Sequence, residues 1–364
     1  MSPSVPGALK IAGGSLIAVG TVAAGAAIGL AVQRRVVARS MHSDADWFLP
    51  TFTPRVHEFT TTDGTALHVE IDEPQGIKAP ITVILCHGYA LSSASLIFQR
   101  AVLEDRARVI SYDQRSHGKS GRSQVDFDTV AQLGEDLGEL IDAFAPTGPL
   151  MLVGHSMGGM TIMALAEQHP ELFRDRVKAI TFIATTAGGL TEVTFGMPAV
   201  MRTFVHRAAP AMASVLAKTK GIVEVSRRAG GDLSEMIFRS YSFGAHPSKE
   251  ASAFVAEMID DTPIDVLAEF LPALQEHDKY DVLPSLAQCD VVVVVGDSDR
   301  LTPVVFSERL ASGIQGAKLA VIHDGGHMVG VEHHDEVNQL LLEQFDRIEA
   351  GLGKKPGKAA SLWS

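Results

Sequence analysis

A serine with the local pattern of a catalytic nucleophile lies in Gly154-His155-Ser156-Met157-Gly158, between an apolar strand-like run and a helical pattern. A G-x-S-x-G at a strand-to-helix junction forces the serine onto a tight turn, and small residues two before and two after it relieve the crowding. The turn would raise the hydroxyl out of the sheet at the N-terminus of a helix, where backbone N–H groups favour developing negative charge. We therefore expect Ser156 to act as a nucleophile.

A serine hydroxyl is a weak nucleophile at neutral pH, so it needs a general base and a group that orients that base. In hydrolases with this elbow, the acid follows the serine along the chain and the histidine follows the acid. His327 is the expected base, because it lies in a Gly-rich loop after the last expected strand and can reach over the sheet. Its rivals are His323, at the end of that strand, and His333 and His334, which open the final helix.

The expected acid is Asp299, in the segment GDSDRLTP that follows a run of valines. Pro303 starts the next helix, so Asp299 lies in the turn between strand and helix. Asp297 is nearer the end of the strand and is the alternative, with a capping or loop-stabilising role. In this arrangement His327 takes the proton of Ser156, while Asp299 fixes the tautomer of the imidazole and stabilises the imidazolium.

These residues need a scaffold, and the sequence has the pattern of alternating strands and helices. Strands are expected at 81–88, 107–113, 149–154, 177–184, 291–296 and 318–322, and helices at 126–145, 157–168 and 332–350. Two strand-like runs within 56–71 flank an Asp63-Gly64 turn, which is a strong hairpin signal. The runs at 177–184 and 291–296 are too apolar for an exposed edge and belong inside a covered parallel sheet. The sequence therefore predicts an α/β fold with a doubly wound, mostly parallel sheet.

The interval 188–285 departs from this alternation of strands and helices, because it contains helical patterns but no clear strand. It includes the apolar stretches 197–217 and 254–274, which are rich in Met, Phe, Leu and Val. An all-helical insertion between two strands of the sheet is best interpreted as a lid over the carboxyl ends of the strands. We therefore expect a helical lid at 188–285.

Two further motifs each lie directly after an expected strand. His87-Gly88-Tyr89 comes after the first long strand, and YDQRSHGKS at 112–120 comes after the next. Together with the serine elbow and the loop of the expected base, they resemble the α/β-hydrolase superfamily over about residues 55–350, closest to its lid-bearing serine esterase and lipase branch. The resemblance implies the α/β-hydrolase fold with a helical lid, and a mainly structural role for the loop at 112–120.

The resemblance also implies an oxyanion hole. In the family, the residue after the HG pair gives one backbone N–H and the residue after the nucleophile gives the second. Carried over to this sequence, these positions are Tyr89 and Met157. Such donors are typically worth about 3–4 kcal/mol each in the transition state. His87 and His155 are expected to hold loops through hydrogen bonds rather than to react.

The residue types at the site favour one class of reaction. A serine at the elbow argues against the haloalkane dehalogenases and epoxide hydrolases of the superfamily, which use Asp there. We expect a serine hydrolase that cleaves carboxylic esters of hydrophobic or lipid-like substrates through an acyl-enzyme on Ser156. An acyltransferase or thioesterase would use the same triad, as would the cofactor-free peroxidases, whereas nothing marks a site for the substrate amine of a peptidase. A catalytically silent hydrolase-fold binding protein is the alternative from another class, although such proteins usually lose a triad member.

Composition and charge exclude several other classes. The chain has 364 residues, of which 46% are hydrophobic and 20% charged. This composition excludes a chain that is mainly disordered, collagen-like or coiled coil. Its two cysteines exclude a disulfide scaffold and any cysteine-built zinc or iron–sulfur site. A net charge of −12 argues against a nucleic-acid binder. With no G-x-G-x-x-G, Walker loop or plausible metal cluster, we expect no cofactor and no metal.

The N-terminus carries an uncharged apolar run at 11–32, preceded by Lys10 and followed by Arg34, Arg35 and Arg39. A helix of that length spans about 33 Å, enough to cross the hydrocarbon core of a bilayer. A retained single-pass anchor is the favoured interpretation; a cleaved signal peptide and a buried or disordered leader are the alternatives. The heavier positive charge after the span predicts that the folded domain lies on the cytoplasmic face.

The membrane is thus one expected partner, and a hydrophobic ester substrate is the other. Gly25 and Gly29 form one GxxxG pair, which is weak evidence for self-association through the span. The expected organisation is an N-terminal membrane anchor at 1–40, a linker at 41–54, an α/β-hydrolase core at 55–187 and 286–350, a helical lid at 188–285 and a flexible tail at 351–364.

Overall fold

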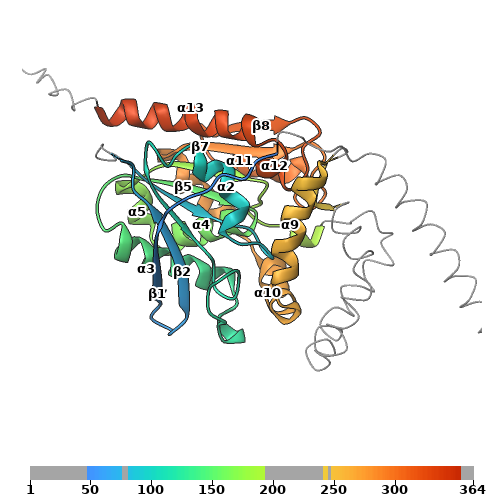
Figure 1. Ribbon diagram of the computed structural model, residues 1–364. Coiled ribbons are helices and arrows are strands. Elements are labelled where there is room, and N and C mark those ends of the chain that lie inside the picture. Colours follow the sequence, from blue (N-terminus) through green and yellow to red (C-terminus); the bar gives the residue numbers. More distant parts are fainter. Residues whose placement is uncertain (1–46, 76–80, 193–240, 245–246, 354–364) are drawn as a thin grey trace, which may run out of the picture.

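The computed structural model describes residues 47–75, 81–192, 241–244 and 247–353 (Figure 1). The expected membrane span at 11–32 and the apolar stretch at 197–217 lie outside these residues, as does most of the expected tail. Within the described part of the chain, no helix combines the length and the apolarity needed to cross a bilayer.

Eight strands form a single sheet in the order β1-β2-β4-β3-β5-β6-β7-β8. The strands are β1 (Arg55–Thr60), β2 (Ala66–Asp72), β3 (Thr82–Cys86), β4 (Arg108–Tyr112), β5 (Leu150–His155), β6 (Val177–Ile183), β7 (Asp290–Gly296) and β8 (Lys318–Ile322). Neighbouring strands are parallel from β4 to β8, and β2 is antiparallel to both of its neighbours. The predicted mostly parallel sheet is therefore confirmed.

The predicted hairpin is formed by β1 and β2. Its turn lies at Asp63-Gly64, where Gly64 has φ +90°, a left-handed conformation that costs glycine little. The side chain of Asp63 accepts a hydrogen bond from the backbone N–H of Thr65 at 3.0 Å, and this contact closes the turn. The hairpin lies at one edge of the sheet, far in sheet order from the strands that carry the predicted triad.

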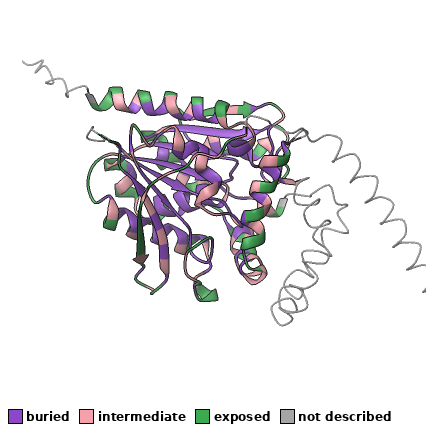
Figure 2. Cartoon of the chain, viewed as in Figure 1, coloured by how far each residue is buried: buried purple, intermediate pink, exposed green. Residues whose placement is uncertain are grey.

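Helices cover both faces of the sheet. The α-helices of the described residues are α2 (Ile97–Ala101), α3 (Val130–Phe144), α4 (Met157–Gln168), α5 (Pro170–Asp175), α9 (Lys249–Asp261), α10 (Ile264–Glu276), α11 (Val304–Gly313), α12 (Val329–Glu332) and α13 (His334–Gly353). One face is packed against α3, α4, α5 and α11, and the opposite face against α12 and α13, which α2 contacts in turn. In Figure 1, α13 runs along one side of the sheet, and Figure 2 shows the strands between the layers as mostly buried.

The valine run of β7 explains why this strand lies inside the sheet. Successive side chains of a strand point to opposite faces, so a strand covered on both faces is apolar throughout. Val291 and Val293 accordingly pack into the core on the α3–α4 face, while Val292 and Val294 pack into the core on the α13 face. Burying a side chain of this kind contributes about 1.5–3 kcal/mol. The apolar run thus fixes β7 as an interior strand with its carboxyl end at the predicted acid.

Two helix boundaries differ from the sequence pattern. The helix expected at 126–145 begins only at Val130, because the side chain of Thr129 accepts the N–H of Gln132 at 3.1 Å and caps the helix there. The helix expected at 332–350 is α13, which begins at His334 because His333 leaves helical geometry with φ −123° and ψ 43°. The short helix α12 directly before it was not predicted.

The described part of the interval 188–285 is helical, as the sequence predicts. It contains α9, α10 and the 3-10 segments Leu190–Glu192 and Tyr280–Gln288, and an antiparallel bridge between Gly188 and Asp278 joins its two ends. The apolar stretch at 254–274 forms the second half of α9 and most of α10, with Pro263 as the residue before α10. The role of this interval as a lid stays a prediction.

Candidate active site

Ser156 occupies a strained turn between β5 and α4. Its backbone has φ 51° and ψ −116°, in a region that residues with a side chain rarely adopt. The turn depends on the two flanking glycines: a Cβ on Gly154 would lie 2.6 Å from the carbonyl oxygen of Gly158, and one on Gly158 would lie 2.0 Å from that of Cys86. These contacts explain in physical terms why G-x-S-x-G takes small residues at both ends.

The structure brings together the three residues predicted as a triad. Ser156 Oγ lies 3.0 Å from Nε2 of His327, and Nδ1 of the same ring lies 2.9 Å from Oδ2 of Asp299. The three residues follow the carboxyl ends of β5, β7 and β8, which meet at one edge of the parallel sheet. One imidazole therefore connects a hydroxyl to a carboxylate, which is the geometry needed for general-base activation of a serine.

Asp299 is buried and held by its own loop. Oδ1 accepts the backbone N–H groups of Leu301 and Thr302 at 2.8 and 2.9 Å, and Oδ2 accepts the hydroxyl of Thr302 at 2.7 Å. Burial opposes ionisation, but the charge and hydrogen bond of His327, together with the bonds from Thr302, hold the pKa of Asp299 below its ordinary value. The acid is therefore ionised and fixed in orientation.

Thr302 is a residue that the sequence analysis missed. Its hydroxyl contacts Asp299 and also lies 3.3 Å from Nδ1 of His327. The available signal was the spacing Asp-x-x-Thr directly before Pro303, a pattern in which the carboxylate caps the following turn.

His327 is also held through its backbone. Nε2 of His155 donates a hydrogen bond to the carbonyl oxygen of His327 at 3.0 Å. Burial, and secondarily the nearby charge of His327, lower the pKa of His155 to about 3, so this ring stays neutral with its proton on Nε2. The structural role expected for His155 is confirmed by this contact.

The loop after β3 contains Tyr89, the first predicted oxyanion donor. Nε2 of His87 accepts the N–H of Gln114 at 2.8 Å, and the carbonyl of His87 accepts the Gln114 side chain at 2.6 Å. Burial lowers the pKa of His87, so this ring too is neutral. These bonds confirm the expected structural role of His87.

Met157, the second predicted donor, is the first residue of α4, so its N–H has no partner within the helix. The role of Tyr89 and Met157 as oxyanion donors stays a prediction.

The loop at 112–120 is held by buried polar contacts. The carboxylate of Asp113 accepts the N–H groups of Ser93 at 2.7 Å and Lys119 at 2.8 Å. The fully buried guanidinium of Arg115 binds the carboxylate of Asp136 through two bonds of 2.6 Å. These contacts support the structural role that the resemblance implied for this loop.

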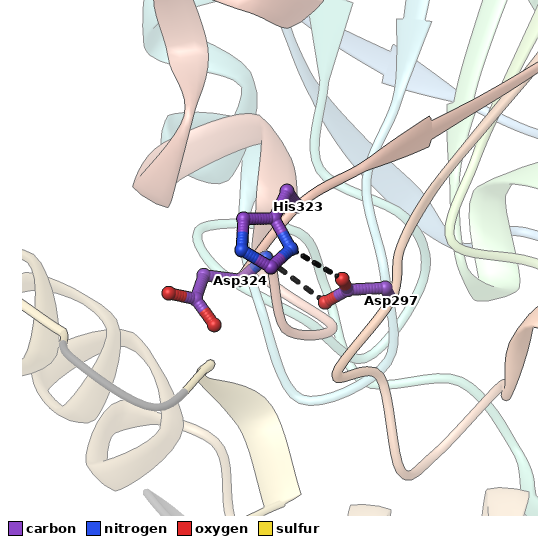
Figure 3. Close-up of side chains that lie close together, drawn as sticks. All are labelled: Asp297, His323 and Asp324. Carbon is purple, nitrogen blue, oxygen red and sulfur yellow. Dashed lines mark hydrogen bonds and ion pairs between the residues drawn. The ribbon is translucent and has the colours of Figure 1, made fainter.

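The rival base and the rival acid bind each other on the surface (Figure 3). Nδ1 of His323 lies 2.8 Å from Oδ2 of Asp297, whose Oδ1 accepts the N–H of Asp324 at 2.9 Å. The side chain of His323 is 89% exposed, and its bond to Asp297 raises its pKa. The pair links the loop of the expected acid to that of the expected base, which confirms the loop-stabilising alternative for Asp297.

The same three side chains form the one group of possible metal ligands found among the described residues. Ligand atoms of Asp297, His323 and Asp324 lie within 4.8 Å of one another. The sequence analysis did not identify this grouping, because Asp297 and His323 follow different strands, β7 and β8. All three side chains are exposed, and exposed acidic groups are common without an ion. We therefore assign no metal to them.

Apolar side chains gather beside the elbow. Met157 and Met160 of α4 form one buried cluster with Val266, Phe270 and Leu274 of α10. The ring of Tyr89 packs against the same cluster, and its hydroxyl donates a hydrogen bond to the carbonyl of Leu267 in α10. The described helix α10 thus packs beside both residues that are predicted as oxyanion donors, Tyr89 and Met157.

Comparison with known proteins agrees with this fold. The family described as the alpha/beta hydrolase fold matches residues 81–334. RutD of Caulobacter sp. (strain K31), provisionally named a carbamate hydrolase, is 28% identical over 261 residues, covering 72% of this chain and 89% of that protein. The proline iminopeptidase PfmaB of Pestalotiopsis fici is 25% identical, covering 80% of this chain and 99% of that protein.

A solved esterase structure, EaEST from Exiguobacterium antarcticum, superposes with a TM-score of 0.63 at 19% identity, covering 79% of this chain and 98% of that chain. At this identity the likeness concerns the fold. The relatives named above are hydrolases that differ in the bond their names specify, so they support hydrolysis without fixing the substrate. The match to the family over most of the described core leads to one conclusion: the chain belongs to the alpha/beta hydrolase fold family.

Proposed function

We propose that the protein is a serine hydrolase that cleaves carboxylic esters of hydrophobic substrates through an acyl-enzyme on Ser156. The observation that carries the proposal is the hydrogen-bonded series from Ser156 Oγ to His327, 3.0 Å, and from His327 to Asp299, 2.9 Å. A buried, ionised carboxylate, an oriented imidazole and a strained serine at a helix N-terminus are the parts that nucleophilic acyl transfer requires.

In the proposed reaction, Nε2 of His327 takes the hydroxyl proton of Ser156 as Oγ attacks the substrate carbonyl carbon. The carbonyl electron pair moves to the oxygen, which is stabilised by the N–H groups of Tyr89 and Met157. The tetrahedral intermediate collapses, the C–O bond to the alcohol breaks, and the alcohol leaves with the proton from His327. Water then attacks the acyl-enzyme in the same way, releasing the acid and restoring Ser156.

The preference for a hydrophobic acyl group rests on the cluster beside the elbow. Met157 follows the nucleophile directly, and its buried neighbours from α10 are Val266, Phe270 and Leu274. An acyl chain held on the side of Met157 would meet apolar rather than charged groups, and each buried methylene contributes about 0.8 kcal/mol of binding. The chain length of the substrate is therefore the property that these residues would set.

Carbamate hydrolysis is the second candidate, favoured by the similarity to RutD. A carbamate presents the same carbonyl carbon to Ser156, and its nitrogen makes that carbon less electrophilic. Transfer of the acyl group to an alcohol, or cleavage of a thioester, would use the same residues and differ in the acceptor or leaving group. The experiment must therefore compare substrates that share a leaving group.

The test is a fluorophosphonate probe on the full chain, with Ser156→Ala as the matched control, followed by turnover of p-nitrophenyl esters from C2 to C16 and of a p-nitrophenyl carbamate. We expect labelling that depends on Ser156, and ester turnover that exceeds carbamate turnover. If the chain labels but turns over the carbamate faster than the esters, carbamate hydrolysis replaces ester hydrolysis as the proposed function. Labelling in which turnover needs an added alcohol would identify a transferase. A folded chain that neither labels nor turns over any substrate would overturn the proposal.

A further inference from the structure

Glu332, the last residue of α12, lies five residues after His327 and is half-buried against the loop that carries it. Its Oε1 accepts the backbone N–H of Gly326, the residue directly before His327, at 2.9 Å. Its Oε2 accepts the N–H of Gly244 at 2.6 Å. One carboxylate therefore joins the loop of the expected base to a segment that lies 88 residues earlier in the chain.

The two joined segments are in close backbone contact. The N–H of Met328, directly after His327, donates to the carbonyl of Ser242 at 2.8 Å, whereas Gly326, directly before it, is joined to the 241–244 segment through Glu332. A Cβ on Gly326 would lie 2.3 Å from the carbonyl carbon of Phe243, and one on Gly244 would lie 1.7 Å from the carbonyl oxygen of Asp324. These glycines let the backbones approach closely enough for one side chain to bond both.

A carboxyl group in this position is costly, which argues that it has a role. Burial raises the pKa of Glu332 to about 8, and the nearby charge of Asp299 adds to the rise, although the bonds from Gly244 and Gly326 oppose it. An apolar side chain would avoid this cost but would leave both backbone N–H groups without this acceptor, which is itself unfavourable. The carboxyl oxygens satisfy both groups at once.

We propose that Glu332 is a positioning residue for His327: it fixes the Gly326–Met328 backbone against the Ser242–Gly244 segment and so sets the approach of Nε2 to Ser156. The inference rests on the proposed function. Glu332 does not touch the reacting atoms, and its effect on the reaction passes through the backbone of the base. A displacement of His327 would slow proton transfer without removing any contact to the substrate, so it would lower kcat and leave KM nearly unchanged.

The test compares Glu332→Gln and Glu332→Ala with the wild-type chain, by the rate of fluorophosphonate labelling per folded molecule and by kcat and KM on one p-nitrophenyl ester. Gln retains one acceptor and Ala retains none. We expect kcat and the labelling rate to fall about tenfold or more in Glu332→Ala and less in Glu332→Gln, with KM changed by less than about twofold. Asp335→Asn, at a 95% exposed side chain on α13, is the matched control and should leave all three values unchanged.

Gly244→Ala tests the same contact from its other side. Its Cβ would collide with Asp324, so the segment must move away from Glu332 while the triad residues stay intact. It should lower kcat as Glu332→Ala does, and it keeps the inference testable if the latter fails to fold. Wild-type labelling rates in both folded variants, whatever their loss of stability, would show a merely structural role and overturn the inference. A wild-type chain that does not label would instead contradict the proposed function.

Discussion

His155 holds the backbone of His327, since Nε2 of the first ring donates to the carbonyl oxygen of the second residue at 3.0 Å. The residue before the nucleophile therefore positions the base, and the two rings lie with their centroids 5.0 Å apart. Because His155 belongs to the end of β5, a strand inside the sheet, it gives the loop of the base a fixed point on the rigid part of the fold.

Replacement of His155 by Phe should therefore slow the reaction. Phe keeps a ring in the buried site but removes the N–H donor, so the carbonyl of His327 loses its bond and the base is less well fixed. We expect kcat to fall about tenfold, because misplacement by about 1 Å can cost up to 10²-fold. The measurement is p-nitrophenyl ester turnover. The control is the same change at an exposed histidine outside the triad, His57→Phe on the edge strand β1, and equal kcat values for both variants would contradict the prediction.

The glycines of the elbow should be sensitive to a single added carbon. Gly158→Ala would place a Cβ 2.0 Å from the backbone carbonyl oxygen of Cys86, and a backbone atom in the sheet cannot easily move. We expect a loss of about 1–3 kcal/mol or more in the free energy of unfolding, measured by urea denaturation. Gly351→Ala, in α13 with no atom within 4 Å, is the control and should be neutral or slightly stabilising. A Gly158→Ala chain as stable as the wild type would show that the elbow can relax.

Local patterns in the sequence were sufficient for the elements that position the triad. The valine run predicted β7 as an interior strand, and G-x-S-x-G predicted the turn at Ser156, because both patterns reflect contacts of a residue with its near neighbours. Context also separated Asp299 from Asp297: only Asp299 lies in the turn, where Thr302 can bind its carboxylate. The structure brings the chosen acid and base to the serine and pairs the rejected acid and base with each other.

Contacts between distant segments could not be predicted in this way. The bond from Gly244 to Glu332 joins residues 88 positions apart, and the bond from His155 to His327 joins residues 172 apart. Such contacts depend on how the loops at the sheet edge pack, and neither periodicity nor composition records that packing. The short helix α12 before His333 was not predicted either, because its 4 residues are too few to show a helical period.

The membrane anchor predicted at 11–32 can be tested independently of the described core. We expect the full chain to remain in the membrane fraction after washing with alkaline carbonate, and a chain without residues 1–46 to be released while keeping its fluorophosphonate labelling. Val22→Arg with Ala24→Arg retains the length of the segment but adds about 2.5–3.5 kcal/mol of insertion cost for each charge near the centre of a span. Release of the full wild-type chain by carbonate would contradict the prediction.

Phe270 should influence which acyl chain is preferred. It is fully buried in the cluster that joins α10 to Met157, so a smaller side chain there would leave space beside the nucleophile. We expect Phe270→Leu to shift the optimum in the C2 to C16 ester series toward longer chains. Phe345→Leu makes the same change at an equally buried phenylalanine on the opposite face of the sheet, and it should lower stability without moving the optimum. An unchanged optimum in Phe270→Leu would place acyl binding elsewhere.

Glu332 should also make the stability of the protein depend on pH. Burial raises its pKa from the ordinary value of 4.5 to about 8, so between these pH values the native state holds a proton that the unfolded chain has released. Stability must then fall as the pH rises through this window, by on the order of 3–5 kcal/mol in total, with the full loss present only above pH 8. Glu332→Gln removes this titration, because an amide does not ionise.

Urea denaturation of wild type and Glu332→Gln at pH 5.5 and pH 8.5 measures this contribution, since other titrating groups act alike in both proteins and cancel in the difference. We expect the wild type to lose more stability than the variant between the two pH values, even if Gln lowers stability at pH 5.5 by losing one backbone acceptor. Equal losses in both proteins would mean that the native pKa of Glu332 is ordinary. The carboxylate would then be accommodated at little net cost, because the two backbone N–H groups would stabilise its charge about as much as burial opposes it.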